Sequence, residues 1–451
     1  MRILRLILLM FGQGVGAWAA TNAIDTAAFA YNQKTTVQAY DSVGHKDSRW
    51  NSDVRECLRL YARYISSTNV NDVARAMTEL KDALPKVVVT GCDDPLIQFL
   101  SLQSLSQEGL APPVLGSKAA ECANALEKSG YPEIRKFYAA LYARDCVRYS
   151  GDPQNQSSNW CAVATQNLAK ALEDRTVPQW LADRWVDALL SGYGPMDANV
   201  WGIYRKLQPV LDRSWTNAGF ALVAKGRGYL SEAWAVRGQG ETGAVLPENW
   251  RAMLVYAGLA EQGFEAAWKS NPRDVRICGG MMHVELLLGR RLEDMDVWFE
   301  RGMKLDPSDF DLCSIRLEYL KPRWHGSPKE MVDFGRFCTG NTNWSGPVRL
   351  MVAYAHDAIA SSLPDEQRQQ DYWSKPEVWE DIRSAFEQFF KLYPDASGYR
   401  HNYARYAIWC QKYPEFLQQV SLFPSTNFAF FGGEEQFRAL VDFAKSKVGR
   451  P

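Results

Sequence analysis

The sequence predicts an all-α fold in which consecutive antiparallel helix hairpins stack into a right-handed superhelix, a solenoid. A turn motif recurs at a fixed offset, because AWKSNPRD, ending at Asp274, returns 35 positions later as GMKLDPSD, ending at Asp309. Apolar residues on both sides of these turns recur every three or four positions, which is the helical period. One hairpin of this length cannot bury its own apolar face, so the hairpins must stack on one another.

The spacing and residue types of these hairpins resemble the tetratricopeptide repeat, in which a small residue lies in the second helix and a proline follows it. Gly302 stands where that family usually has Ala, and Phe299 stands where it has a large aromatic residue. Cys278 and Met282 replace the usual Trp and Gly of the first helix, so the resemblance is one of geometry. It implies a groove lined by the first helix of each hairpin.

A second resemblance covers roughly residues 200–420. Its residues are Trp234, Arg237, Gly238, Gly240, Val245 and Trp250, followed by Leu320, Pro322, Arg323, Trp324, Gly326, Ser327 and Met331. This pattern resembles a bacterial domain family of unknown function, the one numbered four thousand and thirty-four. That family has no assigned activity, so the resemblance implies a fold and leaves the function open.

The N-terminus has the pattern of an export signal, with two arginines, a short apolar run and then the small residues Ala17 and Ala19. We expect residues 1–19 to be removed as a signal peptide by cleavage between Ala19 and Ala20. An uncleaved anchor or a cytoplasmic tail is the alternative. The mature chain is therefore predicted to be periplasmic or secreted from a bacterium. No later apolar stretch reaches the roughly 20 residues that cross a bilayer, so no transmembrane segment is expected in it.

Three segments are expected after the signal peptide. Residues 20–47 are Ala-rich and then polar, which predicts a loosely packed lead-in. Residues 48–237 form an N-terminal helical array, and residues 238–451 form the C-terminal tetratricopeptide-like array, with a Gly-rich stretch at the division.

Two places interrupt the helical pattern of the N-terminal array. The valine run between Lys86 and Gly91 predicts an extended connector, since β-branched residues favour extended backbone. Gly226 and Gly228 lie inside a helical pattern, where each glycine costs about 1 kcal/mol relative to Ala. They predict either a break in the helix or a close contact between helices.

Composition excludes several functions. The 51 basic and 52 acidic side chains nearly cancel, so nucleic acid and anionic membranes are poor partners. The sequence has no H-E-x-x-H, C-x-x-C or G-x-S-x-G motif, and its five histidines are scattered. We therefore predict no catalytic residue, no metal site and no cofactor.

The function predicted from these observations is an exported scaffold without catalysis that binds a protein or peptide partner. Counting from the repeat turns, the first helices should present the following side chains to a groove: Arg276, His283, Asp311, Ser314 and Glu318. The alternative is a carbohydrate-active enzyme with an α/α toroid fold, which would set two carboxylates across an aromatic-lined cleft. Its candidate carboxylate pairs are Asp93 with Asp94, Asp294 with Asp296 and Glu434 with Glu435.

Nine cysteines follow the signal, and an exported protein is expected to pair some of them. Cys146 and Cys161 lie at equal distances from the centre of one hairpin loop, and Cys313 and Cys338 are symmetric about another. Residues that face each other in a hairpin can meet the separation of about 7 Å that a disulfide requires between Cα atoms. These two pairs are the disulfide candidates, and buried thiols are the alternative for each.

Overall fold

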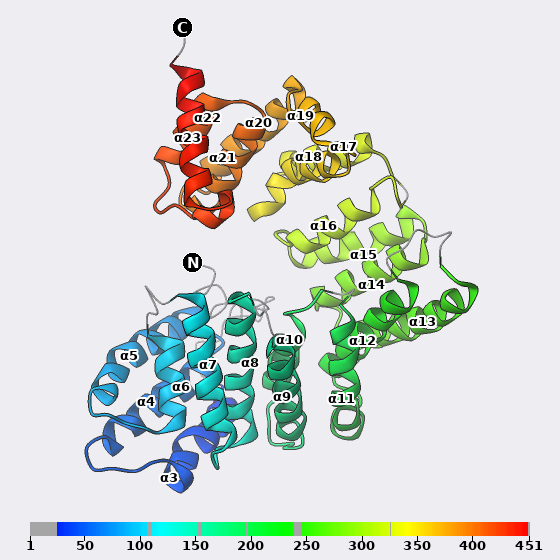
Figure 1. The fold of residues 1–451 in the computed structure, drawn as a ribbon. Helices are drawn as coiled ribbons and strands as arrows, with labels where there is room; N and C mark the ends of the chain where they lie inside the picture. The colour runs from blue at the N-terminus through cyan, green and yellow to red at the C-terminus, as the bar shows by residue number, and fades with distance from the viewer. Residues whose placement is uncertain are drawn as a thin grey trace. The chain divides into compact units, whose positions relative to one another are not determined.

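The structure is a computed structural model that describes residues 25–105, 111–151, 156–194, 197–238, 245–324 and 326–449. Every regular element in these ranges is a helix, as Figure 1 shows, so the all-α prediction is confirmed. Within the same ranges no helix combines the length and the apolar character that crossing a membrane requires. The predicted signal peptide and its cleavage site lie outside the described residues.

The chain divides into two compact units, one that ends at Gly280 and one that begins at Met281. This division differs from the expected one after Arg237, because the helices on either side of residues 238–246 pack closely on each other. Most of the Gly-rich stretch expected at the division lies outside the described residues.

The first unit contains helices that pack on their neighbours in sequence. They are α2 (Thr26–Gln33), the π-helix η1 (Lys34–Gln38), α3 (Ala39–Val43), α4 (Asn51–Ser66), α5 (Val70–Val88), α6 (Pro95–Ser104), α7 (Pro112–Glu127), α8 (Glu133–Tyr149), α9 (Gln156–Ala171), α10 (Gln179–Leu190), α11 (Ala198–Ser214), α12 (Gly219–Arg237) and α13 (Pro247–Ser270). The division between the units falls within α14 (Val275–Leu288). Helices that are next but one in sequence also touch, since α9 contacts α11 and α10 contacts α12.

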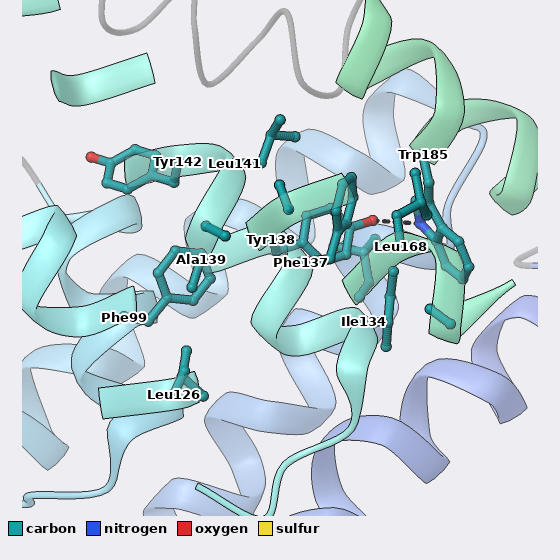
Figure 2. Close-up of a cluster of buried hydrophobic side chains, with 14 of the residues drawn as sticks. Phe99, Leu126, Ile134, Phe137, Tyr138, Ala139, Leu141, Tyr142, Leu168 and Trp185 are labelled. Carbon is teal, nitrogen blue, oxygen red and sulfur yellow. Dashed lines mark hydrogen bonds between the residues drawn. The ribbon is translucent and has the colours of Figure 1, made fainter. Parts of the chain in front are cut away.

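The core of the first unit is aromatic and continuous. Figure 2 shows part of it, where side chains from α6 to α10 meet around Phe137 and Tyr138. The hydroxyl of Tyr138 accepts a hydrogen bond of 2.8 Å from the indole Nε1 of Trp185, so the one polar atom of each ring is satisfied inside the core. This core holds α10 in place beside α12.

The prediction of a loosely packed lead-in is wrong for the part that the structure describes. Residues 26–43 form α2, η1 and α3, and Ala28 and Tyr40 are fully buried. The amide of Asn32 donates to Ser66 at 2.9 Å, and its oxygen accepts from the buried guanidinium of Arg135 at 2.7 Å. The segment packs because α4 and α8 cover its apolar side, and residues so distant in sequence leave no local signal.

The prediction of an extended connector between Lys86 and Gly91 is also wrong for the residues up to Val88, which are helical. Helix α5 continues through Pro85 to Val88, and the chain then turns at Gly91, whose φ is +77°. Val87 is fully buried in the core of the unit. Burial of this valine outweighs the preference of β-branched residues for extended backbone, which is a weak preference.

The two glycines of α12 mark a close contact and not a break, because α12 is continuous from Gly219 to Arg237. An added Cβ at Gly226 would lie 2.7 Å from the ring of Phe264, and one at Gly228 would lie 2.5 Å from the ring of Tyr204. On the facing helix α13, an added Cβ at Gly263 would lie 3.0 Å from the backbone nitrogen of Gly226. Only glycine allows the two backbones to approach this closely.

The second unit continues with helices of the same kind. They are α15 (Leu292–Leu305), α16 (Phe310–Tyr319), α17 (Pro328–Gly340), α18 (Met351–Ser361), α19 (Glu366–Trp373), α20 (Pro376–Leu392), α21 (Arg400–Trp409), α22 (Tyr413–Ser421) and α23 (Glu434–Val448), with 3₁₀ turns η3 (Gly346–Leu350), η4 (Ser397–Tyr399) and η5 (Phe428–Phe431). Its core contains stacked rings, such as Phe386 on Tyr403 at 4.8 Å between centroids.

Both copies of the repeated turn motif share one side-chain hydrogen bond to the backbone. The side chain of Asn271 accepts from the N–H of Arg273, and that of Asp306 accepts from the N–H of Ser308. Asp309 then caps α16 by accepting from the N–H of Leu312 at 2.9 Å. Local side-chain chemistry therefore explains why the chain reverses at each copy of the motif.

Candidate functional site

Four of the five predicted groove residues lie in the second unit, and two of them interact. His283 is on α14, and its Nδ1 atom is buried without a hydrogen-bond partner among the residues that the structure describes. Burial lowers the pKa of His283 to about 4, and the nearby charge of Glu318 opposes this shift. The imidazole is therefore neutral at pH 7 and keeps one unused hydrogen-bonding atom.

Glu318 lies in the last turn of α16 and is held by three residues that follow the helix. Its carboxylate forms ion pairs with Lys321, at 2.6 Å, and with Arg323, and it accepts a hydrogen bond of 3.0 Å from Nε1 of Trp324. Burial alone would raise the pKa of Glu318, but these hydrogen bonds lower it. Glu318 is therefore an anion with fixed orientation. Arg323 and Trp324 are two of the residues that carry the second resemblance.

Asp311 and Ser314 lie on the same side of α16 as Glu318, as their spacing of three and four residues requires. Asp311 is exposed, whereas Ser314 is half-buried and donates its hydroxyl hydrogen to the carbonyl oxygen of Phe310 at 2.9 Å. This side of α16 is the more polar one, because Leu312 and Cys313 face the core. Asp311 is therefore the predicted residue most accessible to a partner.

Arg276, the fifth predicted residue, lies in the first unit and is already engaged in ion pairs. Its guanidinium contacts the carboxylates of Asp183 at 2.8 Å, Asp274 at 2.6 Å and Asp187 at 3.3 Å. Arg227 of α12 contacts Asp187 at 3.2 Å, so the pairs extend over three helices. We call these five side chains of α10, α12, α14 and the turn before α14 the first-unit ion network.

The first-unit ion network has three carboxylates and two guanidinium groups, which leaves one negative charge in excess. Its side chains are partly exposed, from 11% for Asp274 to 35% for Asp183. Burial raises the pKa of Asp183, and the charge of Arg276 opposes that shift. Of these five residues, only Arg276 was predicted from the sequence, because Asp183 and Asp187 are about ninety residues away along the chain and no local pattern links them to it.

The disulfide candidates are all thiols in the structure. Cys146 and Cys161 are buried on the packed helices α8 and α9, where Cys146 interacts with Tyr142 and Cys161 interacts with Tyr193. Both of these helices belong to the first unit. The other pair, in the second unit, is brought together, because the thiol of Cys338 interacts with that of Cys313. Both disulfides remain predictions.

Within the described ranges, no group of three or more His, Cys, Asp or Glu side chains has an arrangement that could hold a metal ion. Comparisons with protein-family models, with curated proteins and with solved structures found no match to this chain.

Proposed function

We propose that this protein is an exported helical-repeat scaffold that binds a peptide or protein partner and has no catalytic activity. The observation that carries the proposal is the first-unit ion network. In a tetratricopeptide-like stack, alternate helices line the groove, and the network joins the alternate helices α10, α12 and α14. The contacts of α10 with α12 and of α9 with α11 support such a stack.

The network can recognise an extended polypeptide segment by charge. Each of its carboxylates has lone pairs that the guanidinium groups do not fill, and these can accept hydrogen bonds from a Lys or Arg side chain or from backbone N–H groups. The excess negative charge favours a segment with basic side chains. Within the second unit, Asp311 is an exposed carboxylate with the same preference for a basic side chain.

The carboxylates considered for the toroid enzyme support the scaffold instead, since most of them have structural partners. Asp94 caps α6, Asp93 lies 3.3 Å from His45, Asp294 pairs with Arg291 at 3.4 Å, Asp296 pairs with Arg316 at 2.7 Å and Glu434 pairs with Arg438 at 2.5 Å. These contacts give the paired carboxylates structural roles.

A pull-down from the native envelope or culture fluid tests the proposal. The wild type is compared with Asp183→Asn plus Asp187→Asn, which removes two charges and keeps the side-chain volume. The control is Lys329→Ala plus Asp333→Ala, an exposed ion pair on α17. We expect the first variant to lose the partner and the control to retain it. Equal recovery by all three proteins would contradict the groove assignment in the first unit.

The second unit is tested in the same experiment with His283→Ala plus Glu318→Ala. Loss of the partner with this variant, at unchanged helical circular dichroism, would place the partner on α14 and α16 as well. The purified wild type is also incubated with a glycan panel. Depolymerisation of any glycan would contradict the scaffold proposal and favour the toroid enzyme.

A further inference from the structure

In the second unit, the buried thiol of Cys313 interacts with a sulfur atom from the helix before it and with one from the helix after it. The thiol of Cys313 on α16 donates to the thioether sulfur of Met303 on α15 at 3.8 Å. The thiol of Cys338 on α17 interacts with that of Cys313, so Cys313 is the shared member. Both cysteines are fully buried and Met303 is 4% exposed, so bulk water does not reach the sulfurs.

We propose that Met303, Cys313 and Cys338 form a binding site for one Cu(I) ion. Thiolate and thioether sulfurs are soft ligands, and soft ligands select Cu(I) over the harder divalent ions. Metal–sulfur bonds are about 2.3 Å long, so three sulfurs arranged trigonally around one ion lie about 4 Å apart. The separation of 3.8 Å between Cys313 and Met303 is close to this value. The dry apolar core would also exclude oxidants and competing oxygen ligands.

The charge and proton balance of binding is simple. The two thiols each release one proton, the methionine sulfur donates a lone pair, and the ion stays Cu(I), so the filled site carries one negative charge. Arg316 lies one helical turn after Cys313 on α16, so it supplies a positive charge on the same side of the helix. Its guanidinium pairs with Asp296 at 2.7 Å, which fixes its position.

A competition titration tests the site. The reduced full-length chain is mixed without oxygen with the Cu(I) complex of bicinchoninate, whose colour reports the copper that remains on the chelator. We expect the wild type to withdraw a single equivalent of Cu(I). Wild-type protein that leaves all the copper on the chelator would overturn the proposal.

Three variants assign the ligands. Cys338→Ser is expected to lose the equivalent of copper, and Met303→Leu, which conserves volume, is expected to bind it more weakly. The control is Cys122→Ser. Cys122 is partly exposed whereas the other cysteines are buried, so it is the thiol at which copper from solution would bind non-specifically. Loss of copper in the control and not in Cys338→Ser would overturn the assignment.

X-ray absorption of the copper-loaded wild type gives an answer that does not depend on how well the variants fold. We expect a first coordination shell of three sulfurs, and a shell with nitrogen or oxygen atoms would overturn the proposal. The disulfide predicted between Cys313 and Cys338 would use the same two sulfurs, so the titration begins from reduced protein, in which both thiols are present.

Discussion

Replacing Gly226 with alanine tests the close packing of α12 on α13. The new Cβ would lie 2.7 Å from the ring of Phe264, which is fully buried. The ring has little room to move away, because it also packs against Gly280 of α14. A Cβ added at Gly280 would lie 2.4 Å from the ring. Such overpacking costs about 1–3 kcal/mol, whereas alanine regains about 1 kcal/mol of helix propensity over glycine. We expect a net loss of stability of about 1 kcal/mol, and at most about 2 kcal/mol.

The matched control is Gly258→Ala on α13. No heavy atom lies within 4 Å of a Cβ added there, so only the helix propensity changes and the variant should gain up to about 1 kcal/mol. Urea denaturation followed by circular dichroism compares the two variants with the wild type. The reasoning is refuted if Gly226→Ala is as stable as Gly258→Ala. Adding Phe264→Leu to Gly226→Ala should recover part of the loss, since the smaller side chain makes room.

Two further predictions concern His283 and the cysteines. Burial lowers the pKa of His283 to about 4 in the folded chain, against 6.5 for an unperturbed histidine, so the unfolded chain binds this proton first and stability falls as the pH drops from 6.5 toward 4. His283→Leu should flatten that part of the stability curve, and parallel curves for the two proteins would argue against the burial of the ring. For the cysteines, mass mapping of the exported chain without reductant is expected to find Cys146 bridged to Cys161, and Cys313 bridged to Cys338 in chains that carry no copper, each bridge contributing roughly 3 kcal/mol. Four alkylated thiols would disprove both bridges.

The features that could be predicted from the sequence are those that depend on residues close together along the chain. The turns at Asn271 and Asp306 were predictable because their side chains bond to N–H groups two residues ahead. Helical spacing likewise put Asp311, Ser314 and Glu318 on one side of α16. The contacts of Glu318 with Lys321, Arg323 and Trp324 could also have been predicted from local sequence, because all three partners lie within six residues of it.

Contacts between distant segments could not be predicted in this way. Arg276 was predicted to line a groove, but its pairing with Asp183 was not predicted, because the two residues are 93 positions apart. Arg135 donates a hydrogen bond to Asn32 in α2, and the two residues are 103 positions apart. The sequence around each residue gives no sign of this contact. Val87 is another residue whose structure depends on distant contacts. The β-branched residues around it predicted extended backbone, but Val87 lies in helix α5 and is buried in the core.

Site-specific photo-crosslinking tests the scaffold proposal most directly. A photoreactive residue at Asp311, exposed on α16, is compared with one at Glu300, exposed on the second helix of the preceding hairpin, α15. Irradiation in the native envelope or culture fluid should join one defined protein or peptide to position 311 and none to position 300. Equal products at both positions, or none at position 311, would contradict the proposal that this protein binds its partner on the first helices of its hairpins.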